Sequence, residues 1–302
     1  MYYYRLYGFV IQTDIEFRQL IGCEETSAEI FVTAGEIPGE ITNRTDVKYE
    51  FGRKISWLVN NTCWLLVQNG NKITYMIKEG GRLEYLKSYI LGWGMSMLAL
   101  QRGVLAMHCS AVGDEQGAFL ICGESGAGKS TLTTELLEWG LRLMADDMAL
   151  IENRNGEVVA SPAFPYQKLC RDVALTKGYR LEEMIYIDEE KDKFLVPYKG
   201  EFSVEPLPVR GILMLGKTKG SVVMDGEITG INRFQLIANN LFLRHLLGQK
   251  KYEPEIGQLC LGVAARVPAA YLIRPLNGDS RSELLQRTMD YIKKWKIPER
   301  EH

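Results

Sequence analysis

The order of apolar and polar positions divides the chain into a β-rich part followed by a part in which strands and helices alternate. Short apolar or alternating segments dominate up to about residue 80, and Asn69-Gly70 between two apolar runs predicts a hairpin. From Leu83 onwards, apolar residues recur at helical spacing up to Arg102. We therefore place a domain boundary near residue 82, with a β-rich region over 1–82 and a second domain over 83–302.

The second domain shows the alternation that is typical of a mixed α/β fold. Glycine-containing turns separate the apolar runs, and one run is followed by a glycine-rich loop. The predicted elements are strands over 104–113 and 117–123, a helix over 129–139, a strand over 141–152, a hairpin around Asn155-Gly156, a similar pair of strands over 210–228, and helices over 233–247 and 281–294.

Composition and charge exclude several classes of protein. Hydrophobic residues make up 46% of the 302 residues, which is enough for a sizeable core. The 36 Lys and Arg residues nearly balance the 38 Asp and Glu residues, and no basic run stands out, so we expect neither a nucleic-acid nor a membrane partner. The amino terminus lacks the features of a signal peptide, and the uncharged run 88–100 is too short to cross a bilayer, so we expect a cytoplasmic protein.

The strongest chemical signal is GESGAGKST at residues 123–131, which fits the pattern G-x-x-x-x-G-K-[ST]. Glycines allow successive backbone N–H groups to face one anion, and the helix that follows directs its positive end to the same point. In such a loop Lys129 reaches the β and γ phosphates, and the Ser130 hydroxyl binds Mg²⁺. An apolar strand before the loop and a helix after it favour nucleotide binding over a chance match. The predicted nucleotide-binding residues are Gly123, Ser125, Gly126, Ala127, Gly128, Lys129, Ser130 and Thr131.

Two adjacent acids, Asp146 and Asp147, follow Lys129 by seventeen and eighteen positions, at the end of an apolar segment. A carboxylate at this place is a common partner of Mg²⁺, and a second one can accept the proton of an attacking hydroxyl. Neighbouring residues in a regular strand point to opposite faces, so both acids serve one site only where the strand ends. The alternative is a solvated turn or a cap of the next element.

His108 lies among small and apolar residues, fifteen positions before Gly123. A histidine in such surroundings is most often a core residue, and its alternative role is to orient a catalytic aspartate. Some cations are further candidates for phosphate contacts, although a surface ion pair is the more common role for each. They are Lys168, Arg171, Arg244 and Arg274.

The succession of a histidine, this loop and Ala-Asp-Asp resembles the catalytic domain of HPr kinase/phosphorylase and its shorter relatives, which are serine kinases. The matching residues are His108, 123–130 and Ala145-Asp146-Asp147. The resemblance implies a phosphate-loop kinase core like that of phosphoenolpyruvate carboxykinase, with ATP and Mg²⁺ as cofactors. It also implies that Asp146 is the base, oriented by His108. Lys129 then assists catalysis, and Ser130 and an acidic side chain, for which we predict Asp147, hold Mg²⁺.

Looser similarity covers residues 2–20, 161–179 and 204–215. Several of the shorter relatives are encoded with lasso-peptide biosynthesis enzymes and phosphorylate a serine of the precursor peptide. The resemblance therefore implies a peptide or protein substrate with an acceptor serine, most specifically a lasso-type precursor. Residues 1–82 are available to recognise it, and a homo-oligomer is left open. The chain lacks the second glycine-rich signature of the full-length enzymes, which argues against HPr as substrate. A small-molecule kinase and a nucleotide-dependent switch are the alternatives.

Overall fold

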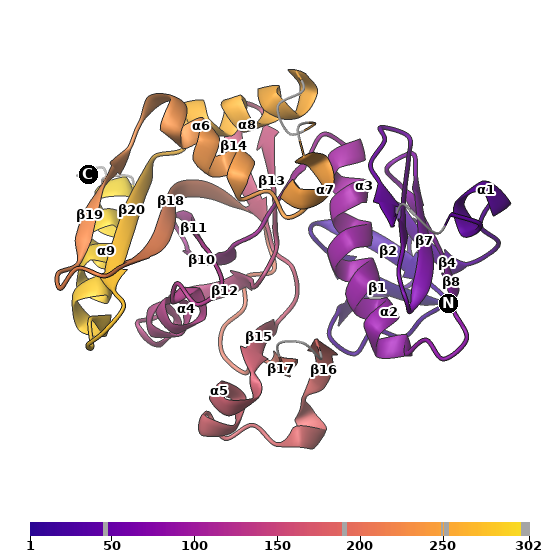
Figure 1. The fold of residues 1–302 in the computed structure, drawn as a ribbon, viewed down its shortest axis with the longest axis horizontal. Helices are drawn as coiled ribbons and strands as arrows, with labels where there is room; N and C mark the ends of the chain where they lie inside the picture. Colours follow the sequence, from indigo (N-terminus) through magenta and orange to yellow (C-terminus); the bar gives the residue numbers. More distant parts are fainter. Residues whose placement is uncertain (45–47, 189–191, 249, 251–253, 297–302) are drawn as a thin grey trace. The chain divides into compact units, whose positions relative to one another are not determined.

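The computed structural model describes residues 1–44, 48–188, 192–248, 250 and 254–296. These residues form a mixed α/β fold that divides into two compact units (Figure 1). The first unit comprises Met1–Ala106, Phe164–Tyr198 and Phe242–Ile256, and the second comprises Met107–Ala163, Lys199–Leu241 and the described part of Gly257–His302. The structure thus groups residues 83–106 with the amino-terminal sheet, whereas the apolar pattern places a boundary near residue 82.

The first unit is built on a sheet of short strands in the order β3-β1-β2-β4-β8-β7-β6-β5. The antiparallel pair β7 and β8 confirms the hairpin predicted at Asn69-Gly70. The elements of this part are β1 (Tyr2–Leu6), β2 (Phe9–Thr13), β3 (Ile21–Gly22), β4 (Ile30–Ala34), α1 (Gly39–Thr42), β5 (Tyr49–Glu50), β6 (Ile55–Val59), β7 (Cys63–Gln68) and β8 (Lys72–Ile77).

One continuous helical segment in the same unit confirms the helix predicted up to Arg102. It consists of α2 (Leu83–Tyr89), the π-helical turn η1 (Ile90–Gly94) and α3 (Met95–Gln101). The recurring side chains from Leu86 to Leu98 are buried, whereas Leu83 at the start of α2 is exposed. Among the described residues, no helix combines the length and the apolar character that crossing a bilayer requires.

A small second sheet completes the first unit, with the strand order β15-β17-β16. A compact cluster of apolar side chains around Phe194 holds it together. The remaining elements of this unit are β15 (Tyr166–Cys170), α5 (Arg171–Thr176), η2 (Leu181–Glu183), β16 (Ile185–Asp188), β17 (Lys193–Pro197) and α7 (Arg244–Leu247).

The second unit is built on a sheet with the strand order β12-β10-β11-β18-β14-β13-β9, to which β20 is added beside β18 and β19 beside β20. The strands are β9 (Leu105–Met107), β10 (Ser110–Asp114), β11 (Gly117–Gly123), β12 (Arg142–Ala145), β13 (Ala149–Arg154), β14 (Glu157–Ser161), β18 (Leu207–Thr218), β19 (Met224–Ile228) and β20 (Ala269–Pro275). The helices are α4 (Lys129–Glu138), α6 (Gly230–Asn239), α8 (Pro254–Arg266) and α9 (Arg281–Trp295).

The core of the second unit lies between α4, α9 and the sheet strands β10, β11, β18 and β20. Alternate strand residues face this layer, as expected for a sheet with one face under two helices. The cluster includes Phe119 and Ile121 of β11, Leu213 and Leu215 of β18, Leu132 and Leu136 of α4, and Leu284, Met289 and Ile292 of α9. In Figure 1, α9 runs alongside β20 and β18, and α4 follows directly from β11.

Several predicted elements differ from the observed ones in the same way, because pairings between distant residues interrupt them. The segment 104–113 is split into β9 and β10, and 141–152 into β12 and β13, where Asp147 takes a left-handed φ of 72°. The helix predicted over 233–247 ends at Asn239, and Leu241 forms a β-bridge with Met107 before α7 begins. The strands predicted as a pair over 210–228 are separated by β20, which lies between β18 and β19. The hairpin at Asn155-Gly156 and the helix over 281–294 are confirmed.

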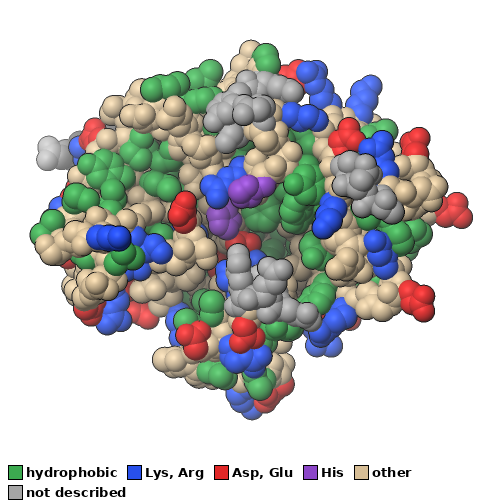
Figure 2. Space-filling model, in the orientation of Figure 1, with side chains coloured by type: hydrophobic (Ala, Val, Ile, Leu, Met, Phe, Trp, Pro, Cys, Tyr) green, Lys and Arg blue, Asp and Glu red, His purple; other side chains and the backbone are tan. Residues whose placement is uncertain are grey.

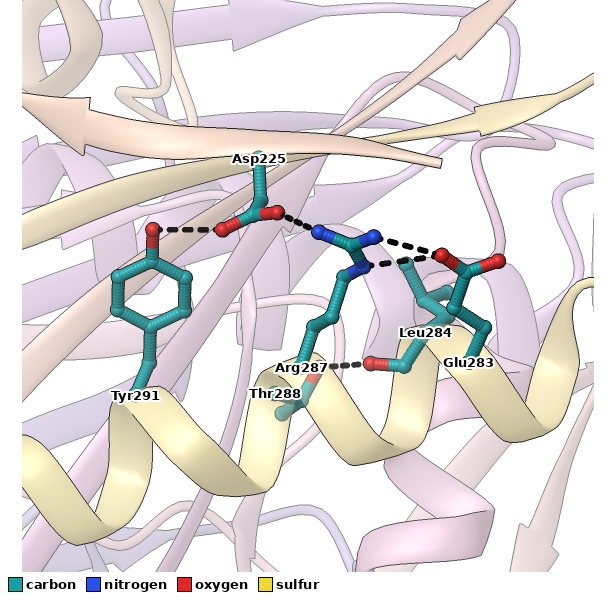
Figure 3. A network of polar contacts seen from close by, with 6 residues as sticks. All are labelled: Asp225, Glu283, Leu284, Arg287, Thr288 and Tyr291. Carbon is teal, nitrogen blue, oxygen red and sulfur yellow. Dashed lines mark hydrogen bonds and ion pairs between the residues drawn. The ribbon is translucent and has the colours of Figure 1, made fainter. Parts of the chain in front are cut away.

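Polar contacts fasten α9 to the edge strand β19 (Figure 3). Arg287 forms an ion pair with Asp225 of β19 and a second one, at 2.7 Å, with Glu283 one turn earlier on α9. The Tyr291 hydroxyl donates a hydrogen bond of 3.0 Å to the other Asp225 oxygen. Burial and this contact with a carboxylate raise the pKa of Tyr291 to about 12, so the phenol stays protonated as a donor. The first three turns of α9 are therefore held by polar contacts on one side and by the apolar core on the other.

Charged side chains of both signs are interspersed on the face drawn in Figure 2. This distribution agrees with the net charge of −2. The described residues on this face therefore present a mixed surface and not a field of one sign.

Gly211 of β18 generates a prediction about packing, because a Cβ at this position would overlap the indole ring of Trp295. Gly211→Ala should lower the free energy of unfolding by about 1–3 kcal/mol, since the end of α9 must move to make room. Urea denaturation measures this change. Gly262→Ala inside α8 is the control, because a Cβ there would come no closer than 4.0 Å to Arg266 and the replacement should leave stability equal or raise it by up to about 1 kcal/mol. Equal stability of the two variants would contradict the packing assignment.

Candidate functional site

The strand directions of the second unit bring several chain segments to one edge of its sheet. β11, β18 and β20 are mutually parallel neighbours, and β10 runs antiparallel between β11 and β12. The carboxyl ends of β11, β12, β18 and β20 and the start of β10 therefore lie at the same edge. Loops at this end of a sheet with parallel strands are where ligands commonly bind.

Residues 123–128, called here the glycine loop, connect β11 directly to α4. Gly126 and Gly128 have φ values of 76° and 110°, which a residue with a side chain rarely adopts. Gly128 is also the last residue before α4, which begins at Lys129. The unpaired N–H groups of the first helical turn, including those of Ser130 and Thr131, therefore point towards the loop. This backbone arrangement suits an anion at the helix start.

Three cations surround the glycine loop. Lys129 Nζ donates hydrogen bonds to the carbonyl oxygens of Gly123 at 2.6 Å and Glu124 at 3.4 Å. Arg274, at the end of β20, donates from Nε to the Ala127 carbonyl at 3.0 Å and from its terminal nitrogen to the Gly126 carbonyl at 3.2 Å.

The third cation is Lys217, near the end of β18, where its exposed ammonium stands over the loop. A Cβ built on Gly126 would lie 3.4 Å from Lys217 Nζ. Within the described residues, Lys217 donates no hydrogen bond and forms no ion pair. The loop therefore concentrates three positive charges, which favours a ligand with several negative charges.

His108 lies against Asp147. Its Nδ1 is 3.1 Å from the backbone carbonyl oxygen of Asp147 and 3.7 Å from the carboxylate oxygen Oδ1. Both side chains remain partly exposed, with relative exposures of 39% and 29%. Asp147 also has a left-handed φ, which aspartate tolerates better than most residues but which still costs energy. The strained turn and the imidazole together direct a carboxylate to the open edge of the sheet.

Asp146 has a different partner. The hydroxyl of Ser110, the first residue of β10, donates a hydrogen bond of 2.7 Å to Asp146 Oδ1. Ser110 is buried, and its place on β10 is set by the pairing of Ala111 with Ala145 on β12. The Ser110 hydroxyl thus contacts Asp146, and the His108 imidazole lies next to Asp147.

Cys109, between His108 and Ser110, is not a candidate nucleophile. The neighbouring Cys122 thiol and complete burial raise the pKa of Cys109 well above its usual value. A protonated, buried thiol is unreactive. The chemistry of this edge therefore depends on oxygen and nitrogen groups.

The oxygen donors fit Mg²⁺ bound together with a phosphate ligand. Among the described residues, no group of three His, Cys, Asp or Glu side chains comes together as a metal site. Mg²⁺ in phosphate sites typically takes one or two protein oxygens and completes its shell with phosphate and water. The Ser130 hydroxyl at the start of α4 and the carboxylates that follow β12 are donors of this kind.

The structure brings His108, the glycine loop, Lys129, Ser130 and the Asp pair to one edge of the sheet. Of the four cations considered from the sequence, Arg274 reaches the loop, whereas Arg171 pairs with Asp192 at 2.8 Å in the first unit. Sequence reasoning missed Ser110 and Lys217. Ser110 follows His108 by two positions and could have been noticed, but nothing near Lys217 in the sequence connects it to the loop.

Comparisons with known proteins add little information about the function of this site. No family model matches the chain, and no curated protein is similar to it. One solved structure that resembles it is the HPr(Ser) kinase/phosphatase from Coxiella burnetii, with 14% identity and a TM-score of 0.30, over 63% of this chain and 94% of that chain. The function proposed below therefore rests on the sheet edge itself.

Arg274 generates the prediction of this site. Arg274→Ala removes both hydrogen bonds to the loop carbonyls and one positive charge, so binding of inorganic tripolyphosphate should weaken by about 10-fold or more. Arg274→Lys should recover part of the loss, because it keeps the charge without the forked geometry. Isothermal titration calorimetry measures both. Arg210→Ala, which removes hydrogen bonds to Gln116 and Glu157 elsewhere in the unit, is the matched control. Equal effects at both arginines would contradict a specific role for Arg274.

Proposed function

We propose that this chain is a phosphotransferase that moves the γ-phosphate of Mg²⁺-bound ATP to a hydroxyl group, with a phosphate-loop core of the HPr-kinase-like type. One observation carries the proposal. A glycine loop at a helix start, surrounded by three cations, shares a sheet edge with an imidazole–carboxylate pair. The first feature suits the donor phosphates, and the second suits an acceptor that must lose a proton.

On the donor side, the backbone N–H groups of the loop and Lys129 bind the β and γ phosphates. Lys129 now bonds to two loop carbonyls, and a phosphate offers its ammonium a charged acceptor in their place. Lys217 and Arg274 neutralise further negative charge as the phosphoryl group is transferred. Mg²⁺, when bound, screens the phosphate oxygens, and Ser130 is the hydroxyl proposed to hold it.

On the acceptor side, the contacts of His108 lead us to propose a different division of the acids from the one that the family resemblance implies. Asp147, next to His108 and partly exposed, accepts the proton of the attacking hydroxyl. Asp146, held by Ser110, is the carboxylate proposed to support Mg²⁺ with Ser130. The acceptor oxygen forms a bond to the γ-phosphorus while the bond to the bridging oxygen breaks, so ADP leaves and the proton remains on Asp147.

The acceptor is proposed to be a serine in a peptide or protein, and more narrowly a lasso-type precursor peptide. This part rests on the sequence resemblance alone. The test is to incubate the protein with Mg²⁺, γ-labelled ATP and a library of serine-containing peptides, and to map the label by tandem mass spectrometry. Label on a small metabolite from an added extract would replace the peptide acceptor. Slow hydrolysis that no acceptor stimulates would favour a nucleotide-dependent switch.

Lys129→Ala should reduce turnover by at least about 10²-fold, because the ammonium stabilises charge that develops on the transferred phosphoryl group. Phosphate release from γ-labelled ATP measures the rate, and the far-ultraviolet circular dichroism spectrum verifies that the fold is kept. Lys219→Ala removes the same charge from an exposed turn of the same unit and is expected to behave as wild type. A Lys129 variant with normal turnover would remove the glycine loop from the mechanism.

The two acids should separate kinetically. Asp147→Asn should abolish transfer while Mg²⁺·ATP still binds, because the amide cannot accept the proton. Asp146→Asn should instead raise the Mg²⁺ concentration needed for half-maximal turnover, since one metal-supporting charge is lost. Titrating Mg²⁺ against turnover and ATP binding in both variants measures the difference. The opposite pattern would restore Asp146 as the base.

A further inference from the structure

A pocket of about 400 Å³ opens beside the glycine loop, on the side of α4 and α9. Its size lies within the range of small-molecule sites. Its lining comes from the end of the loop, one side of α4, the end of β20 and the turn that leads into α9. The lining residues include Gly128, Thr131, Glu135, Arg274, Asp279 and Ser280.

The pocket extends away from the loop along α4. Thr131 and Glu135 both line it, and residues four apart lie on the same side of a helix. Glu135 is seven residues beyond Gly128, which corresponds to about 10 Å along the helix axis. A triphosphate bound at the loop and the first turn of α4 would therefore point its organic end into this pocket.

The polar groups of the pocket are not equivalent. Asp279 is already paired, because Arg281 donates to its two oxygens at 3.0 and 2.9 Å, and these hydrogen bonds lower the pKa of Asp279 to about 2. Within the described part of the chain, no group donates a hydrogen bond to the Glu135 carboxylate. Burial raises the pKa of Glu135, and the nearby Arg281 guanidinium offsets this effect only in part.

We infer that this pocket binds the nucleoside of the phosphate donor and that Glu135 accepts hydrogen bonds from the ribose hydroxyls. This inference rests on the proposed function. Vicinal hydroxyls are the donors of a nucleoside nearest to its phosphates, and an acidic side chain is a common partner for them. The buried side chains of Leu132 and Leu284, which also line the pocket, supply an apolar wall for the base.

The wall formed by α9 is held in place before a ligand binds. Leu284 belongs to the core cluster, and Glu283 beside it is tied through Arg287 to Asp225 of β19 (Figure 3). A preformed wall loses little conformational entropy on binding. Discrimination between donors therefore depends on the pocket residues themselves.

The experiment compares Mg²⁺·ATP, Mg²⁺·2′,3′-dideoxy-ATP and Mg²⁺·tripolyphosphate by isothermal titration calorimetry. Wild type should bind ATP more tightly than either of the other two. Glu135→Ala should weaken ATP binding by about 10-fold and leave dideoxy-ATP and tripolyphosphate unchanged, because only ATP donates to the carboxylate. Ser280→Trp, which obstructs the pocket, should weaken both nucleotides and spare tripolyphosphate. Glu138→Ala is the control, since it removes an equal charge from the end of α4 and Glu138 does not line the pocket.

The outcomes separate the inference from the proposed function. If the protein binds tripolyphosphate and neither Glu135→Ala nor Ser280→Trp changes ATP binding, the nucleoside pocket is contradicted. The proposed phosphotransferase function is not affected by that result. Equal losses for Glu135→Ala and Glu138→Ala would also overturn it, since general charge would then explain the effect. Failure of wild type to bind ATP and tripolyphosphate would overturn the proposed function and this inference with it.

Discussion

The register of β10 between β11 and β12 is the constraint on which the candidate site depends. Ser110 pairs with Ile121 on one side, and Ala111 pairs with Ala145 on the other. This pairing places the start of β10 level with the ends of both neighbours, so that an imidazole, a loop and two carboxylates share one edge. A slip by one residue would turn Ser110 to the other face of the sheet and separate it from Asp146. The arrangement of the candidate site therefore follows from the backbone hydrogen bonds of β10 with its two neighbours.

Positive charge around the glycine loop is held by the loop's own carbonyl groups. Lys129 and Arg274 together donate to four of its carbonyl groups, those of Gly123, Glu124, Gly126 and Ala127. Because Lys129 and Arg274 bind these carbonyl groups, the N–H groups of the loop remain available to a ligand. The same bonds that stabilise the loop therefore organise it for an anion, and the ligand has little backbone to reorder on binding.

Chain segments far apart in sequence complete this arrangement. Lys217 lies near the end of β18, which pairs with β11, and Arg274 lies near the end of β20, which pairs with β18. Their side chains reach a loop that lies some ninety and one hundred and fifty residues earlier. The last helix then covers α4 and closes the far wall of the pocket. The candidate site therefore combines a short sequence motif with residues that no local sequence pattern connects to that motif.

Local features of this protein could be predicted from the sequence. Glycine-containing turns at Asn69-Gly70 and Asn155-Gly156, the helical spacing after Leu83, and the loop followed by α4 are each specified by neighbouring residues. The breaks in the predicted strands were decided only by the tertiary structure. The same apolar sequence pattern is compatible with one long strand or with two short ones. Those breaks lie at His108 and at Asp146-Asp147, where candidate chemistry is found. The insertion of β20 beside β18, and with it the place of Arg274, depends on pairing between strands about sixty residues apart, which no local periodicity encodes.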